Sequence, residues 1–168
     1  MGKLGKKTLI IDLDPQGNAT TGLGVNKGNI NYSVYDVLNG SCEAKKAVRK
    51  TGFTNLSIIP ATINLAGIDI ELMEKGYQNV EFKKNEQLRN ALATIMDNYD
   101  YMIIDCPPSL GLLTTNALVA SDSVIIPVQC EFFALEGITQ LLNTIIMTQT
   151  RLNPNLKIEG VLLTLLDS

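Results

Sequence analysis

The sequence predicts an α/β fold, a doubly wound and mostly parallel sheet with helices on both faces. Five short segments are rich in Ile, Val and Leu, as in parallel strands that are buried on both faces. Helical patterns lie between these segments and hairpin signals are few, so right-handed parallel crossovers are expected. The predicted strands span residues 7–12, 56–60, 101–105, 123–128 and 158–164.

The predicted helices follow in chain order. Ser33 and Asp36 have the Ser-x-x-acid spacing of a capping box that opens a short helix, and Gly40 could end it. Longer helical patterns cover residues 63–75, 85–97, 110–120 and 135–151, and Asn153-Pro154 ends the last one. No internal repeat or low-complexity linker interrupts this pattern, which predicts a single domain over residues 1–168.

Composition excludes several classes of function. A net charge of -3 argues against a chain that binds nucleic acid through overall positive charge. The three cysteines, the lack of a signal-like start and the lack of a long apolar run favour a cytoplasmic protein without a membrane contact. The absence of His excludes imidazole catalysis. A basic helical face is expected at Lys45, Lys46, Arg49 and Lys50, and a solvated surface is favoured over a DNA patch there.

Two predicted strands run directly into carboxylates and then into turns that contain proline. The first ends at Asp12 and continues to Asp14, and the second ends at Asp105. Open α/β sheets place ligands at the carboxyl ends of their strands, so both sites would face one crevice, suited to Mg²⁺ and water. A structural role is the alternative, because such residues also shape Asp-Pro turns and cap helices.

Three stretches carry a resemblance to a known family. Residues 9–24, 105–118 and 127–137 resemble the ParA/Soj-type partitioning ATPases, in the family's order and over nearly the whole chain. Members of that family begin with a strand, a Walker A loop and a helix, whereas Met1 to Lys7 resembles only the close of that helix. Members also continue beyond Ser168. The expectation is an internal fragment, or the product of a mis-set start, with one partial P-loop ATPase domain.

The resemblance implies roles for the first carboxylate segment. Asp14 would lie beside the γ-phosphate of ATP and orient the attacking water as the catalytic residue. Asp12 would support the outer shell of Mg²⁺ and the shape of the loop. Gly17 would let the backbone approach phosphate closely, although it could also be only a turn residue.

The resemblance also implies a second switch after the strand that ends at Asp105. Asp105 fits the Walker B role, in which a carboxylate holds Mg²⁺ through a water. Pro107 and Pro108 would stiffen the loop that reports whether a γ-phosphate is present. Gln129 and Glu131 match a family loop near the nucleotide and the dimer interface.

For the parent protein, the resemblance implies a cytoplasmic, nucleoid-associated ATPase that forms a homodimer around Mg-ATP. It would bind DNA nonspecifically and be regulated by a ParB-type centromere-binding partner. The fragment itself is expected to be inactive and to bind no cofactor. The alternatives are a noncatalytic interaction module and a relative similar to the cell-division regulator MinD. The family's loop strand would lie between residues 101–105 and 123–128, so its absence should leave two apolar strand edges unpaired.

Overall fold

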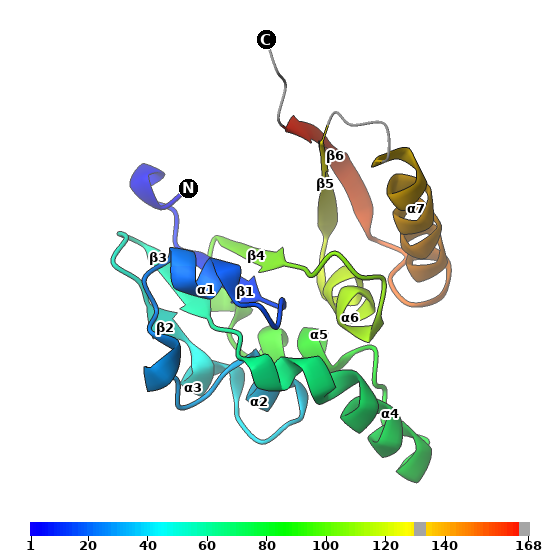
Figure 1. Cartoon of the computed structure of the whole chain (residues 1–168), viewed down its shortest axis with the longest axis horizontal. Coiled ribbons are helices and arrows are strands. Elements are labelled where there is room, and N and C mark those ends of the chain that lie inside the picture. Colours follow the sequence, from blue (N-terminus) through cyan, green and yellow to red (C-terminus); the bar gives the residue numbers. More distant parts are fainter. Residues whose placement is uncertain (130–133, 165–168) are drawn as a thin grey trace.

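The computed structural model describes residues 1–129 and 134–164, which form an α/β fold with two groups of strands. A four-stranded sheet has the order β2-β3-β1-β4, and β5 pairs with β6 in a second sheet (Figure 1). The strands are β1 (Thr8–Asp12), β2 (Arg49–Lys50), β3 (Leu56–Ile59), β4 (Tyr101–Asp105), β5 (Ser123–Gln129) and β6 (Lys157–Thr164).

Strand β1 is central to the larger sheet. It runs parallel to β3 on one side and to β4 on the other, with Ile11 opposite both Ile59 and Ile104. The side chains of Leu9 and Ile11 are fully buried in the larger hydrophobic core. Strand β5 is parallel to β6. The expected mostly parallel α/β fold is therefore confirmed, and β2 is the antiparallel exception.

Seven α-helices occur in the described residues. They are α1 (Asn18–Gly22), α2 (Val34–Leu38), α3 (Ala44–Ala47), α4 (Ile68–Gln78), α5 (Gln87–Ala93), α6 (Leu112–Ala120) and α7 (Ala134–Arg151). Helix α5 contacts both α2 and α6, and α7 packs on β5. None of the helices described is both long and apolar enough to cross a membrane.

Helix α2 begins and ends as its sequence predicts. The Asp36 carboxylate accepts a hydrogen bond from the Ser33 backbone N–H at 2.8 Å, which confirms the capping box. Gly40 follows the helix with φ of 78°, a left-handed conformation that glycine adopts without a steric cost.

The prediction of one basic helical face at Lys45, Lys46, Arg49 and Lys50 is wrong. Helix α3 ends at Ala47, and Val48 has an extended backbone. Arg49 and Lys50 then pair with Ile58 and Ser57 as β2. Hydrogen bonding to the edge of β3 therefore determines the conformation of this short segment, against its local helical pattern.

Two other predicted helices are shorter than expected because they include 3₁₀ turns. The segment from residue 63 begins as a 3₁₀ helix, η3 (Ile63–Gly67), and becomes α-helical only at Ile68. The segment from residue 85 contains α5 and a separate 3₁₀ turn, η4 (Met96–Asn98). Two further 3₁₀ turns are η1 (Gly2–Leu4) and η2 (Lys27–Asn29).

Two of the edge strands among the described residues are β4 in the larger sheet and β5 in the smaller one. Strand β4 pairs with β1 alone, and β5 pairs with β6 alone. Large apolar side chains are exposed on these strands, with 45% for Tyr101, 42% for Ile103 and 60% for Ile125. Unpaired strand edges with exposed apolar side chains are templates for association with another chain.

We predict that the chain self-associates through these edges. Ile103→Lys should weaken self-association roughly fivefold or more, because it places a charge where an apolar contact would form. Ile70→Lys is the control, because Ile70 is the same residue type and is also exposed, at 66%, but lies on α4. Sedimentation velocity measures the association, and hydrogen exchange measures protection along β4 and β5. A strictly monomeric chain with strong amide protection along both strands would contradict the prediction.

Candidate functional site

Strands β1 and β4 bring the predicted carboxylates to one edge of the sheet. Asp12 and Asp105 are the last residues of the two strands and lie opposite each other in the parallel register. The Leu13 N–H donates to the Asp105 carbonyl oxygen at 2.8 Å, so the two chains remain paired where they leave the sheet. Sequence reasoning placed both acids at strand ends that face one crevice, and the structure shows that these two strands are neighbours.

Asp12 is completely buried, and both of its carboxylate oxygens accept hydrogen bonds. Oδ2 accepts from the backbone N–H of Thr20 at 2.8 Å and from its hydroxyl at 2.7 Å. Oδ1 accepts from the backbone N–H of Asp14 at 3.1 Å. A buried carboxylate needs such donors because burial removes its hydration. Asp12 therefore fixes helix α1 and the Asp14 turn to the end of β1.

Thr20 extends this network to a third segment. Its hydroxyl oxygen accepts a hydrogen bond from the Ala61 backbone N–H at 3.0 Å while the hydroxyl hydrogen points to Asp12. The chain that follows β3 is thereby tied to the same carboxylate. Sequence reasoning did not single out Thr20. Its position near the start of a short helix after an acidic turn was the available signal.

Asp14 lies in a tight turn and remains partly accessible. Its Oδ1 accepts from the Gln16 backbone N–H at 2.9 Å, and its carbonyl oxygen accepts from Gly17 at 2.8 Å. Across residues 1–129 and 134–164, Oδ2 of Asp14 has no hydrogen-bond partner. The turn therefore orients the side chain through one oxygen and leaves the other oxygen for a water or a ligand.

Gly17 has a local structural reason to be glycine. Its φ of 63° lies in the left-handed region, and a Cβ there would lie 2.9 Å from Cε of Lys27. The ammonium group of Lys27 donates to the Gln16 carbonyl oxygen. Lys27 thus covers the turn and gives it a positive charge, a contact that sequence reasoning missed because Lys27 lies in another segment, η2.

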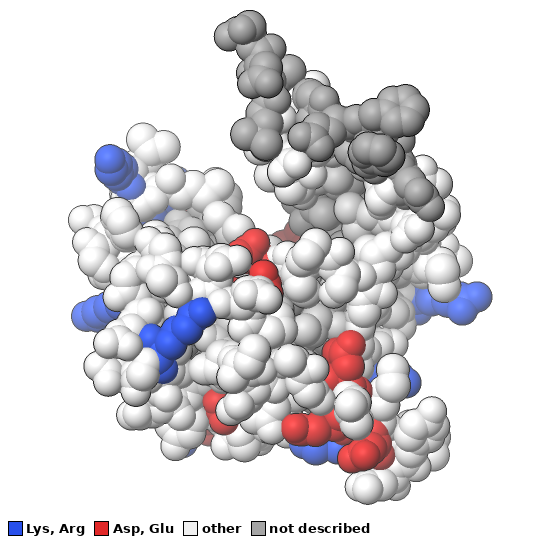
Figure 2. All heavy atoms as spheres, in the orientation of Figure 1, with Lys and Arg blue, Asp and Glu red and all other residues white. Residues whose placement is uncertain are grey.

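Asp105 has a pKa that is raised above its ordinary value. Burial is the largest cause that raises its pKa, followed by the negative charges of Asp12 and Asp14. Asp105 is nonetheless an exposed residue, so solvent weakens the effect of burial and of the neighbouring charges on its pKa. Figure 2 shows acidic side chains, and no basic ones, in the middle of the visible face where β1 and β4 end. The arrangement therefore favours a cation or a hydrogen-bond donor as its ligand.

The loop after Asp105 leads to the start of α6. Pro107 is partly buried and Pro108 is exposed. The Leu112 backbone N–H donates to Oδ2 of Asp69 at 3.4 Å, which places a carboxylate at the start of a nine-residue helix. Sequence reasoning missed Asp69, since only the tertiary fold brings α4 to this position.

The third stretch of the family resemblance is only partly described. Gln129 is exposed at the end of β5. Glu131 lies outside the described residues.

The chemistry of the donors suits Mg²⁺ as one part of a larger site. Magnesium prefers oxygen ligands and uses one or two carboxylates together with waters and phosphate oxygens. Asp105 and the free oxygen of Asp14 meet that requirement at the carboxyl ends of β4 and β1. No group of three His, Cys, Asp or Glu side chains in the described part of the chain is placed to hold a metal ion by itself.

Comparisons with known proteins give the family of the chain. Residues 1–158 match the family described as "AAA domain". Soj, the sporulation initiation inhibitor protein of Bacillus subtilis (strain 168), is 53% identical over 98% of this chain and 63% of its own length. The chromosome partitioning protein ParA of Myxococcus xanthus is 48% identical over 97% of this chain and 56% of its own. The chain thus spans about three fifths of these relatives.

Solved structures agree with the fold. A cobyrinic acid a,c-diamide synthase from Mycobacterium smegmatis, with bound ATP analog and magnesium, is 41% identical with a TM-score of 0.90. That match covers 99% of this chain and 65% of the other. A plasmid partition protein from Borrelia burgdorferi is 27% identical with a TM-score of 0.76, over 96% and 69% of the two chains. In sequence and in fold, the chain belongs to the ParA/Soj-type family of partitioning ATPases.

Proposed function

We propose that the chain carries the two switch carboxylates of an ATP- and Mg²⁺-dependent DNA-partitioning ATPase. The observation that supports this most is that Asp105, at the end of β4, lies opposite Asp12 and close enough to Asp14, in the turn after β1, for the Asp14 charge to raise its pKa. The structural match whose protein holds an ATP analog and magnesium supports the choice of ligand. Positive charge from Mg²⁺ and from further residues would offset the repulsion among the carboxylates.

Each residue has a role that its contacts explain. Asp14 would use its unpartnered oxygen to orient the attacking water, because its other oxygen is held by Gln16. Asp105 would hold Mg²⁺ through a water, while Asp12 keeps both segments in register from within the fold. Bound ATP would supply the phosphoryl group, and its Mg²⁺ would supply positive charge beside the carboxylates. Phosphoryl transfer depends mainly on such positioning and charge compensation.

The loop after Asp105 is the proposed second switch. Pro107 and Pro108 restrict its backbone, and it leads directly into α6. A change in this loop would therefore be passed to the start of a packed helix. We propose that the whole protein works as a cytoplasmic, nucleoid-associated homodimer. It would bind DNA nonspecifically and be regulated by a ParB-type partner, as the partitioning relatives suggest.

A noncatalytic interaction module is the second candidate. The unpaired edges of β4 and β5, with Ile103 and Ile125 exposed, favour it because they could pair with another subunit. A MinD-like regulator has weaker support: the cell division ATPase MinD of Pyrococcus furiosus is 22% identical, which supports only the fold.

The first prediction from the proposed function concerns nucleotide binding by residues 1–168 alone. We expect no appreciable affinity for Mg-ATP, because Asp14 and Asp105 repel ATP and the nearby Lys27 ammonium already donates to the Gln16 carbonyl oxygen. Calorimetric titration of the isolated chain measures this. Micromolar affinity would show that these residues suffice for the nucleotide site and would contradict the prediction.

The second prediction separates the two carboxylates in a longer protein that includes the family's flanking segments. Asp14→Ala should keep ATP binding and lower ATP turnover roughly 100-fold, because only water positioning is lost. Asp105→Ala should instead weaken Mg²⁺-dependent nucleotide binding. Asp122→Ala, an exposed acid before β5, is the control. Equal turnover by the Asp14→Ala variant and its parent would remove Asp14 from the mechanism.

The third prediction concerns pH. The raised pKa of Asp105 means that folding disfavours its charged form, so this penalty is absent below the ordinary pKa of 3.8. The penalty develops as pH rises towards the raised pKa and is complete above it. Asp105→Asn should therefore raise the Tm at pH 7 by roughly 1–2 °C, allowing for solvent screening, and leave it unchanged at pH 3.

Thermal unfolding of Asp105→Asn and of an Asp122→Asn control at both pH values tests the third prediction. A variant that is no more stable than the parent at pH 7 would show that folding does not disfavour the charged form of Asp105.

A further inference from the structure

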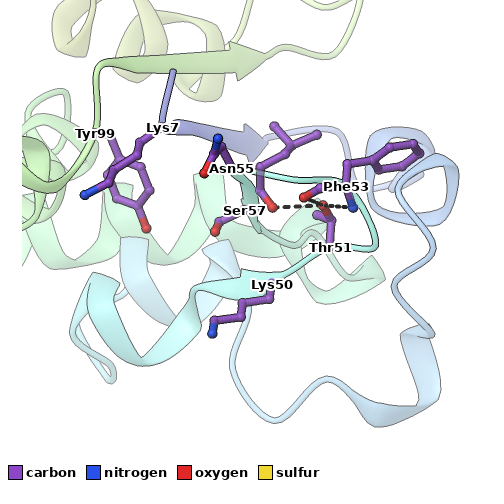
Figure 3. A pocket seen from close by; sticks show the side chains of 8 residues that line it. Lys7, Lys50, Thr51, Phe53, Asn55, Ser57 and Tyr99 are labelled. Carbon is purple, nitrogen blue, oxygen red and sulfur yellow. Dashed lines mark hydrogen bonds between the residues drawn. The ribbon is translucent and has the colours of Figure 1, made fainter. Parts of the chain in front are cut away.

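A hollow of about 350 Å³ lies at the opposite end of the same strands (Figure 3). Lys7 precedes β1, Tyr99 precedes β4, and Ser57 lies near the start of β3. Lys50 contributes from β2. Because β1 and β4 are five residues long, the hollow lies roughly 16 Å from the strand-end carboxylates. It is therefore separate from the proposed ATPase site.

The charged side chains that line this hollow are all cationic. They are Lys7 and Lys50, and no carboxylate is among the lining residues. Both lysines are exposed, and neither forms an ion pair with any residue that the structure describes. Asp100 follows the lining residue Tyr99, and its Oδ2 accepts from the Lys7 backbone N–H at 2.7 Å. The two ammonium groups remain available for an anion.

Neutral donors lie between the two lysines. Figure 3 shows the Tyr99 and Ser57 hydroxyls pointing towards each other on the side of the hollow between Lys7 and Lys50. Burial raises the pKa of Tyr99, and a hydrogen bond with Ser57 partly opposes that rise. The phenol therefore keeps its proton at neutral pH and can donate a hydrogen bond to an anionic oxygen.

The loop that carries Phe53 lines the hollow at the end away from Lys7 and Tyr99 (Figure 3). The Thr51 hydroxyl donates to the Leu56 carbonyl oxygen at 2.8 Å and accepts from the Phe53 backbone N–H at 3.1 Å. These bonds fix the loop that presents the Phe53 ring, which is 55% exposed. An exposed aromatic ring beside a cationic hollow can pack against an apolar group of a ligand.

We propose that this hollow binds a small phosphate monoester. The phosphate would lie between Lys7 and Lys50, near the hydroxyls of Tyr99 and Ser57, and the apolar part of the molecule would pack on Phe53. Charge-assisted hydrogen bonds from two ammonium groups match the charge of a phosphate dianion. The size of the hollow suits a small molecule. The proposal does not depend on the proposed ATPase function.

Phenyl phosphate and inorganic phosphate are the probes, and the whole chain of 168 residues is the protein. Calorimetry measures affinity, and amide chemical shifts of Asn55 and Ser57 locate the site. Lys7→Gln and Lys50→Gln should each weaken phenyl phosphate binding roughly five- to tenfold. Lys50→Arg should bind like the parent. Lys45→Gln is the matched control, since it removes the same charge from an exposed residue of α3 outside the hollow.

The supporting result is saturable binding of phenyl phosphate, tighter than inorganic phosphate, with Phe53→Ala removing that difference. The proposal is overturned if no saturable shifts occur or if Lys45→Gln weakens binding as much as Lys50→Gln. Equal affinity of the two probes overturns the apolar contact with Phe53. A single-stranded oligonucleotide that binds with the same lysine dependence, while phenyl phosphate does not, overturns the assignment to a small molecule.

Discussion

The buried carboxylate of Asp12 is the constraint on which the rest of this structure depends. Burying an ionised carboxylate costs several kcal/mol, and that cost must be offset by donors inside the fold. Thr20 and Asp14 supply three hydrogen bonds, and the Thr20 hydroxyl also receives the Ala61 N–H. One side chain therefore joins β1, helix α1, the Asp14 turn and the segment after β3.

This arrangement separates structural from chemical roles among residues that look alike in the sequence. Asp12 is fully buried and both of its carboxylate oxygens accept hydrogen bonds, so its role is structural. Asp14 and Asp105 retain access to solvent at the same strand edge. Burial raises the pKa of Asp105 most, and the negative charges of Asp12 and Asp14 raise it further, so placing these acids together has an energetic cost. Titratable groups with shifted pKa values at the ends of strands are typical of sites that act on charged ligands.

Local patterns predicted the fold well where local physics decides the conformation. The strands were placed within about a residue by their apolar runs, and the capping box of Ser33 and Asp36 has its expected geometry. Arg49 and Lys50 were misassigned because pairing with β3 overrides their helical pattern. In the site, the strand-end acids were predictable. Lys27 and Asp69 were not, because their contacts cross between segments that are distant in sequence. The catalytic roles stay predictions.

Helix α6 belongs to both hydrophobic clusters of the molecule. Its Leu113 and Ala117 lie in the larger cluster, and its Leu118 lies in the smaller one with Ile126 and Ile145. The Asn153 side chain also donates to the Leu118 and Ser121 carbonyl oxygens at 3.0 and 2.8 Å. The smaller cluster contains fewer buried residues than the larger one, so it should unfold locally before the larger cluster does. Movement of β5 and β6 would then shift the end of α6 that packs on them. The start of α6 is held in the larger cluster, beside the loop that follows Asp105.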